Sequence, residues 1–460
     1  MIVRSRIIKG FTARGIGQAV TLCIRLVEIP LMFHFWGVNL YGEWLVLIAI
    51  PAYLSMSDFG FGNVTARHMA ILVASDKRDE AIGVFQSSYI LITASSLCLS
   101  ILLLIGTWAT DISEVFSFDL ITEQNAIVIM AIFCLKMALR LQIGQCFAGL
   151  QCEGKYPLGL LLIALLDLLE FLLLAGAVVF GATPSEAAGC ICFGTVLGLL
   201  SFHLALQSQV PWIKHGWRKA NFSHIKELWK PSLAAMAFPL GQAMSFDGPR
   251  LIISAIIGPA AVSIFVAHRQ LVRFSSLALA FGAPLQAELA MSYGRDGMSA
   301  YRRQALRTTQ LLIWLSFLAL LFASSAGILL FTHWTSGRIS VHYQLLWLLA
   351  AATFGEAIWR SLLLPVSAIN RHTRAALSYL IVSTIILAPA LYIFTGMMGL
   401  AGAALALIVA EIAMISITVR ENTRLLQVNT AELMAQAAKP PIFILTEARS
   451  LWQKKFANEA

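Results

Sequence analysis

The stretch LGLLLIALLDLLEFLLLAGAVVF, residues 158 to 180, decides the class of fold. Its length matters because about 20 apolar residues in a helix cross a hydrocarbon layer roughly 30 Å thick. Its pattern matters because apolar and polar residues do not alternate, as they would in the strand of a membrane barrel. The stretch therefore predicts a transmembrane helix.

Apolar runs of similar length recur along the whole chain of 460 residues. Apolar residues make up 58% of the chain and charged residues 12%, whereas soluble domains have about 45 to 50% and about 25%. We therefore expect an all-α integral membrane protein. About twelve transmembrane helices are predicted, at residues 15–36, 43–74, 81–108, 125–150, 157–180, 187–210, 231–256, 260–292, 304–332, 343–368, 375–395 and 400–420.

The charges in the predicted loops indicate which side of the membrane each loop faces. If the N-terminus is cytoplasmic, the inner loops and termini hold 23 of the 33 Lys and Arg residues, and the outer loops hold only Arg338. This distribution follows the positive-inside rule, so we expect both termini in the cytoplasm. The net charge of +9 then reflects topology, and no nucleic acid partner is expected.

A basic connection at residues 211–230 lies near the middle of the chain, with six predicted spans on each side. We expect a cytoplasmic segment at 1–14, an N-terminal six-helix lobe at 15–210 and a C-terminal six-helix lobe at 231–420. Two such repeats are one plan that transporters use, and it places the substrate path between the lobes. The segment from Ile444 to Lys455, in the cytoplasmic tail at 421–460, either lies on the inner membrane surface or is disordered.

Seventeen charged residues fall within the predicted spans. Each costs at least about 2.5 to 3.5 kcal/mol near the centre of a membrane helix unless it is paired or hydrated, so such residues mark a transport path or a polar network. The basic ones are Arg25, Arg67, Lys136, Arg140, Arg250, Arg269, Arg273, Arg307 and Arg360. The acidic ones are Glu28, Asp58, Asp167, Glu170, Asp247, Glu288, Glu356 and Glu411.

Spacing offers a local explanation for some of these charges. Three pairs are three or four residues apart, on one helix face, where they can neutralise each other: Arg25 with Glu28, Asp247 with Arg250, and Glu356 with Arg360. For these pairs a structural role and a functional role both stay open. Arg307 and Glu288 lie near the inner ends of their spans, from which we expect them to reach lipid headgroups.

Arg269 and Arg273 stand four residues apart in FVAHRQLVRF, with no acidic residue between 248 and 287 to offset them. Acidic residues on other helices, such as Asp247 or Glu28, can supply the balancing charge. An anionic ligand is the other source, because the planar guanidinium group suits phosphate oxygens. The sequence leaves both explanations open.

A second unusual stretch is SMSDFGFGNVTAR, residues 55 to 67. Gly60 and Gly62 weaken a helix, Pro51 removes a backbone donor, and Asp58 and Asn63 can bond the freed backbone groups. We expect the second span to be broken here, with Arg67 facing a wet cavity; close helix packing is the competing explanation. AFPLGQAMSFDGPR repeats the theme in the seventh span, with Pro239 and Gly248 as further hinges.

Both broken segments resemble a known family. GVNLYGEWLVLIAIPAYLSMSDFGFGNVTARHMA and FPLGQAMSFDGPRLIISAIIGPAAVSIFVAHRQLVR are similar to the corresponding segments of bacterial polysaccharide transporters. A fainter similarity extends over about residues 10 to 420. The resemblance is to the O-antigen or repeat-unit flippases of the multidrug, oligosaccharidyl-lipid and polysaccharide exporter superfamily.

The resemblance implies two lobes around a V-shaped central cavity in the bacterial inner membrane, and alternating access. The implied activity moves an undecaprenyl-diphosphate-linked oligosaccharide, an O-antigen (lipopolysaccharide) or exopolysaccharide repeat unit, to the outer leaflet. Polysaccharide polymerase and glycosyltransferase partners are implied as well as membrane lipid. The diphosphate would be held by Arg25, Arg67, Arg250, Arg269 and Arg273. A polar network or coupling role falls to Glu28, Asp58, Asn63, Asp247, Glu356 and Arg360.

Two other functions fit the sequence less well than the flippase. The same fold could serve a cation-coupled multidrug or organic-cation antiporter, which would call for acidic and aromatic cavity residues. A membrane polymerase or ligase ranks lowest, because the longest outer loop, ATDISEVFSFDLITEQN, has no evident nucleophile and base. The histidines follow no ligand spacing, so neither metal nor cofactor is expected.

Overall fold

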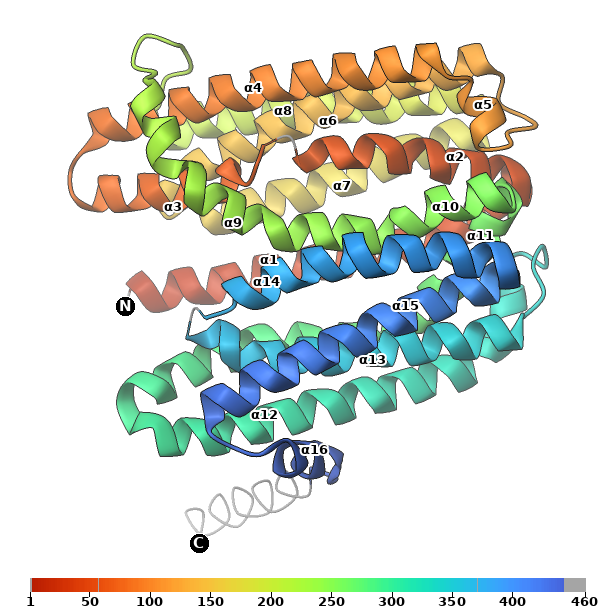
Figure 1. The fold of residues 1–460 in the computed structure, drawn as a ribbon. Helices are drawn as coiled ribbons and strands as arrows, with labels where there is room; N and C mark the ends of the chain where they lie inside the picture. The colour runs from red at the N-terminus through yellow and green to blue at the C-terminus, as the bar shows by residue number, and fades with distance from the viewer. Residues whose placement is uncertain (1, 57, 370, 442–460) are drawn as a thin grey trace, which may run out of the picture. The chain divides into compact units, whose positions relative to one another are not determined.

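The computed structural model describes residues 2–56, 58–369 and 371–441, and all of its regular elements are helices (Figure 1). The all-α prediction is confirmed. Ile444 to Lys455 lies outside the described residues. The elements of the N-terminal half are α1 (Ile2–Phe35), α2 (Gly37–Ala52), η1 (Tyr53–Met56), α3 (Phe61–Ala74), α4 (Arg78–Ala109), α5 (Ile112–Val115), α6 (Glu123–Cys152), α7 (Tyr156–Val179) and α8 (Pro184–Gln209). Those of the C-terminal half are α9 (Phe222–Phe246), α10 (Gly248–Ile256), α11 (Pro259–Arg273), η2 (Phe274–Phe281), α12 (Gly282–Trp334), α13 (Tyr343–Ala368), α14 (Thr373–Ile381), η3 (Val382–Leu387), α15 (Ala388–Leu426) and α16 (Thr430–Ala438).

Nine helices within the described residues are long and apolar enough to cross a membrane. The difference from twelve has a local cause. In place of the predicted span at 231–256, α9 is long enough to cross a membrane but not apolar enough, the span at 260–292 is divided into shorter helices, and the last two predicted spans form one helical stretch, Thr373–Leu426. Within that stretch Gly399 leaves the helical conformation, with φ of 62° and ψ of −140°. A change of direction at a glycine therefore replaces the loop expected there.

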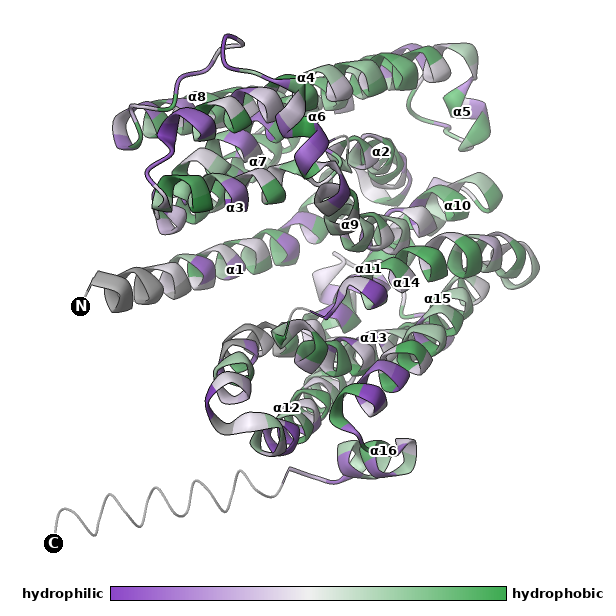
Figure 2. Ribbon diagram, turned by 60° about the vertical axis from the view of Figure 1, so that its left-hand side comes forward, coloured by the Kyte–Doolittle hydropathy of each residue, from purple (hydrophilic) through white to green (hydrophobic). Residues whose placement is uncertain are grey.

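The outer surfaces of the long helices are apolar, as Figure 2 shows along α4. Large side chains on α4 are 53 to 58% exposed, and they include Leu97, Ile101, Leu102 and Ile105. A water-soluble protein would not leave so long an apolar stripe uncovered. The chain is thus a multi-pass membrane protein.

The chain forms two compact units that interleave along the sequence. The first unit comprises Met1–Ala267, Thr332–Ser340 and Ser383–Ala403, and the second comprises His268–Phe331, Val341–Val382 and Ala404–Ala460. The helices α11, α12 and α15 each contribute residues to both units. The division into six-helix lobes on either side of residues 211–230 stays a prediction.

In the first unit α1 packs on α7, and α6 packs on both α4 and α8. Small residues allow close approach of the helices, as is usual in membranes. A Cβ atom on Gly198 would come within 2.5 Å of the Leu166 side chain. Residues from α3, α4, α6, α7 and α8 share one buried apolar cluster.

The break expected in the second span is present in the first unit. Helix α2 ends at Ala52, a 3-10 segment follows, and α3 begins at Phe61 after Gly60, whose φ is 76°. The Asp58 carboxylate accepts hydrogen bonds from the backbone N–H groups of Gly60 (2.9 Å) and Gly62 (3.3 Å). Asp58 therefore satisfies donors that the broken helix leaves open, as predicted.

The YGEW motif at the start of α2 joins several parts of the first unit. A Cβ atom on Gly42 would meet the carbonyl oxygen of Pro259 at 2.0 Å, so the two quoted family motifs touch at a glycine. The buried Glu43 carboxylate accepts hydrogen bonds from the backbone N–H groups of Asp119 (2.8 Å), Leu120 (2.9 Å) and Ile121 (2.7 Å). This carboxylate holds the loop after α5 against α2.

The second unit has its own polar contacts between helices. Tyr301 on α12 donates a hydrogen bond to the carbonyl oxygen of Pro365 on α13 (2.6 Å), and Asn422 on α15 donates one to that of Leu362 (2.6 Å). The short helix α16 is held by an ion pair of Glu432 with Arg302 (2.9 Å). These bonds brace the second unit around α13.

Candidate functional site

A network of charged side chains joins α6, α7 and α8 in the first unit. On α6, Arg140 pairs with Asp167 (2.7 Å) and with Glu170 (2.9 Å), both on α7. Lys136, one turn earlier on α6, also pairs with Glu170 (3.2 Å). The Thr195 hydroxyl on α8 donates to the other oxygen of the Glu170 carboxylate (2.6 Å). Glu170 is therefore a buried carboxylate with both oxygens bonded, which offsets the cost of charge at membrane depth.

The predicted residues of α1 lie near a second group of charges in the same unit. The Glu28 carboxylate accepts a hydrogen bond from the Tyr41 hydroxyl (3.4 Å) and interacts electrostatically with Arg250 and Arg25. Arg250 pairs with Asp247 (2.9 Å), its neighbour three residues earlier. The structure thus brings four of the predicted site residues together from α1 and the junction of α9 with α10.

The two groups meet at a pocket of about 280 Å³ within the first unit. Its polar lining includes three carboxylates and two cationic groups, from Arg25, Glu28, Lys136, Asp167 and Glu170, and its apolar lining comes from α1, α2, α7 and α8. Glu28 also interacts electrostatically with Lys136. The pocket can hold water or a small cation, and its volume lies just below the range for small-molecule sites.

A third group of charges lies in the second unit. Arg269 and Arg273 on α11 interact electrostatically with Glu356 on α13. The Arg360 side chain donates a hydrogen bond to Glu356 (2.8 Å), and its guanidinium lies over the ring of Trp359, 5.0 Å from the centroid. The Trp359 indole N–H donates to Glu411 on α15, which also interacts with Arg269. Acidic residues on other helices therefore do face the arginine pair, but they are Glu356 and Glu411.

The charge balance differs between the two units. The first unit's groups contain four cationic and four acidic side chains, from Arg25, Glu28, Lys136, Arg140, Asp167, Glu170, Asp247 and Arg250. The second unit's group, which we call the α11 cluster, contains three arginines and two glutamates: Arg269, Arg273, Glu356, Arg360 and Glu411. The α11 cluster therefore has more cationic than anionic groups.

The other predicted site residues lie apart from these groups. Arg67 is exposed on α3 and forms no ion pair with another described residue, so its binding role stays a prediction. The side chain of Asn63 lies outside the described part of the structure. Asp58 serves the backbone break instead of a charged cluster.

The expected hinges fall at different kinds of position. Pro51 lies near the end of α2, while α9 continues through Pro239 without interruption. Gly248 begins α10 directly after Asp247, whose backbone stays helical with φ of −92° and ψ of −30°. The break in the seventh span is therefore slight. Pro249 at the second residue of α10 fits a helix start, where its missing N–H costs nothing.

Five of the predicted intramembrane charges do not belong to the predicted site but lie in these groups: Lys136, Arg140, Asp167, Glu170 and Glu411. These five residues lie outside the two segments that resemble polysaccharide transporters. Their signal was the pairing pattern: Lys136 and Arg140 are four apart and Asp167 and Glu170 three apart, on two neighbouring helices. Matching charged pairs on consecutive spans would have identified the network.

Among the described residues no group of three or more His, Cys, Asp and Glu side chains could hold a metal ion. The seven cysteines are free thiols. The charged groups of both units can bind ions, water and hydrogen-bonding substrates. Among their described side chains, no nucleophile lies beside a base and an orienting group in the arrangement that catalysis needs.

No family model and no curated protein sequence matches the chain. Solved structures do match. A multidrug resistance MATE family transporter of the MOP superfamily, in an inward-facing conformation, is 16% identical, with a TM-score of 0.71 over 89% of this chain and 99% of that chain. The lipid II flippase MurJ, in an inward closed conformation, is 15% identical, with a TM-score of 0.63 over 99% of this chain and 100% of that chain.

A third similar structure is a MOP superfamily transporter from Pyrococcus furiosus, whose binding pocket is described as having reverse polarity. It is 16% identical, with a TM-score of 0.59 over 92% of this chain and 96% of that chain. At such identities the likeness shows the fold alone. The chain therefore has the fold of these transporters.

Proposed function

We propose that this protein is a flippase that moves an undecaprenyl-diphosphate-linked oligosaccharide across the bacterial inner membrane by alternating access. The observation that carries the proposal is the gathering of three arginines, Arg269, Arg273 and Arg360, around Glu356 and Glu411 in the α11 cluster. Guanidinium groups that gather at membrane depth mark a polar path, and they favour an anion as the ligand. A diphosphate provides such an anion, and arginine binds it through paired hydrogen bonds.

The fold and the sequence support the same function. The chain shares its fold with the lipid II flippase MurJ over its whole length, and two of its segments resemble those of polysaccharide transporters. In the proposed cycle Arg269 and Arg273 hold the diphosphate while the lipid tail stays in the bilayer. No covalent bond is made or broken. The glycan is an O-antigen or exopolysaccharide repeat unit, which a polymerase then receives outside.

The test replaces Arg269 and Arg273 by glutamine in cells that lack the native protein. A charge-assisted hydrogen bond contributes about 1.5 to 3 kcal/mol, so we expect glycan export to fall by about tenfold or more for each arginine removed, while the lipid-linked glycan accumulates. Mass spectrometry of the lipid extract and surface glycan staining measure both. Replacing Arg303 and Arg307, exposed residues of α12, by glutamine is the matched control.

Export that stays normal in the Arg269→Gln, Arg273→Gln variant, at normal protein level, would remove the diphosphate assignment. Export that falls equally in both double variants would show a general effect of charge. Only selective loss in the α11 variant supports the proposal.

The alternative is a cation-coupled multidrug or organic-cation antiporter, and the pocket of the first unit favours it. That pocket has three carboxylates, and MATE transporters share the fold. We rank it second because Glu170 and Asp167 are already paired with Arg140 and because the pocket is small for a drug. Resistance to several organic cations that is gained on expression, and lost in Glu28→Gln, would favour the antiporter.

A further inference from the structure

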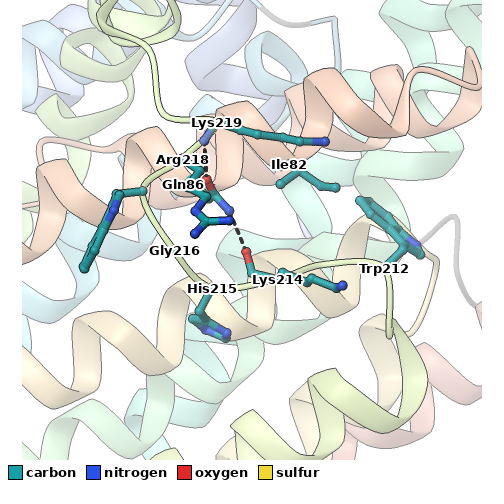
Figure 3. A pocket seen from close by; sticks show the side chains of 9 residues that line it. Ile82, Gln86, Trp212, Lys214, His215, Gly216, Arg218 and Lys219 are labelled. Atoms are coloured by element: carbon teal, nitrogen blue, oxygen red, sulfur yellow. Dashed lines mark hydrogen bonds between the residues drawn. The ribbon is translucent and has the colours of Figure 1, made fainter.

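The connection between α8 and α9 is fastened to α4 in the first unit by side-chain hydrogen bonds (Figure 3). The amide of Gln86 donates to the carbonyl oxygen of Lys214 (2.9 Å) and accepts from the backbone N–H of Lys219 (2.8 Å). The Ser87 hydroxyl accepts from the backbone N–H of Asn221 (2.9 Å). Two neighbouring residues of α4 therefore hold the second half of this connection, from Lys214 to Asn221.

Aromatic rings of α4 pack against His215 of the connection. The ring of His215 contacts those of Phe85 and Tyr89, with centroids 5.4 Å and 5.3 Å apart. Burial, followed by the neighbouring His203, lowers the pKa of His215, which keeps its ring neutral at pH 7. Neutral groups thus contribute to the shape of the connection beside its charged contacts, which include the hydrogen bond from the Trp212 indole N–H to Glu153 (2.8 Å).

The connection borders a pocket of about 770 Å³ whose rim carries three cationic side chains, from Lys214, Arg218 and Lys219. Lys219 pairs with Asp79 (2.5 Å). No ion pair of Lys214 or Arg218 is found within the described parts of the chain, and both side chains are exposed. In Figure 3 the amino groups of Lys214 and Lys219 lie on the same side of the connection as Trp212 and Ile82, which add apolar surface.

Exposed aromatic side chains flank the same pocket. Trp217, which lines it, is 79% exposed, and Phe222 at the start of α9 is 74% exposed. Tryptophan and other aromatic residues collect where the membrane meets water. The positive-inside rule explains basic residues here, but it explains neither the hydrogen bonds from α4 nor the exposed aromatic rings.

We propose that this pocket binds the phosphate headgroup of an anionic phospholipid in the inner leaflet. Lys214 and Arg218 contact the phosphate, and Trp217 rests in the interface beside the acyl chains. Basic pockets beside membrane helices on the cytoplasmic side suit anionic headgroups. A soluble anion would leave the exposed aromatic residues unexplained, so the phospholipid is the ligand that the structure favours.

The test uses the full chain purified in detergent and compares its binding to phosphatidylglycerol and to phosphatidylethanolamine by native mass spectrometry. Each basic residue near an anionic headgroup contributes a factor of about five in affinity. The Lys214→Gln, Arg218→Gln variant should therefore lose the preference for phosphatidylglycerol by roughly 10- to 30-fold. The matched control is Lys226→Gln with Lys230→Gln, which removes the same charge from exposed positions of α9 outside the pocket.

A third variant, Gln86→Met, keeps every charge but removes the hydrogen bonds that shape the connection. We expect it to lose most of the preference while the melting temperature in detergent shows that the chain is folded. Selective loss in the pocket variant and in Gln86→Met supports the proposal.

Three results would overturn it: equal loss in the α9 control, no loss in the pocket variant, or a preference unchanged by Gln86→Met. A further experiment adds inorganic phosphate at millimolar concentration and measures the melting temperature and the amount of bound lipid. If phosphate alone stabilises the chain through Lys214 and Arg218 and displaces the lipid, the ligand is a soluble anion and the lipid assignment is wrong.

Discussion

Glu43 is almost fully buried in α2, and its partners are three consecutive backbone N–H groups of the loop after α5. A carboxylate offers only acceptors, and all three donors are satisfied by it. In Glu43→Gln the amide group would turn a donor toward at least one of these N–H groups. We expect a loss of about 2 to 4 kcal/mol in the free energy of unfolding.

Thermal unfolding in detergent and limited proteolysis of residues 110–121 measure this effect. The control is Glu123→Gln, an exposed residue in the first turn of α6. If both variants unfold and are cleaved alike, the Glu43 hydrogen bonds do not hold the loop.

The sequence shows the charge of Glu43 but not its partners. Those lie 76 to 78 residues further along the chain and are backbone groups, which carry no sequence signal. The pairs Asp247 with Arg250 and Glu356 with Arg360 were predictable because partners three or four apart meet on any helix. The contacts of Arg269 with Glu356 and Glu411 depend on tertiary packing, which spacing alone cannot reveal.

At the scale of the element, the break between α2 and α3 depends on Gly60. Its φ is 76°, and a Cβ atom there would come within 2.4 Å of the Ser232 carbonyl oxygen on α9. In Gly60→Ala the left-handed conformation therefore costs about 1 to 2 kcal/mol. Displacing the backbone of α9 costs about 1 to 3 kcal/mol more. We expect a loss of about 2 to 5 kcal/mol in the free energy of unfolding.

A lower melting temperature in detergent and a lower yield from membranes would show this loss. Gly248→Ala is the matched control, because the nearest atom to its added Cβ, the Tyr53 hydroxyl oxygen, lies at 3.7 Å. Equal melting temperatures for the two variants would mean that Gly60 is not required at the break.

Helix breaks were predictable where several disruptive residues coincide, as in the stretch from Pro51 to Gly62. A single glycine was not enough: Gly297 and Gly399 interrupt long helices, while many other glycines lie in regular helix. A glycine permits a change of direction, but packing around it determines whether the change occurs. For this reason the apolar runs predict the positions of the helices better than the positions of the junctions between them.

For the whole molecule, hydropathy predicts the class of fold because no other arrangement satisfies the backbone in lipid. It does not predict how the helices group. Compact units form through side-chain packing, and α11, α12 and α15 each contribute to both. The same reason separates the charges into a balanced set in the first unit and the cationic α11 cluster in the second.

The orientation of the whole chain in the membrane is open to a direct test. The proposed function and the lipid pocket both need the connection between α8 and α9 to face the cytoplasm, as its basic residues predict. In a chain freed of its seven cysteines, Trp217→Cys should react with a membrane-impermeant maleimide only after spheroplasts are permeabilised. Glu114→Cys, in the exposed segment α5 that the charge distribution predicts to face outward, should react in intact spheroplasts. Labelling of the cysteine-free chain gives the background signal. The reverse labelling pattern would mean that the chain has the opposite orientation in the membrane, with the pocket facing the outer leaflet.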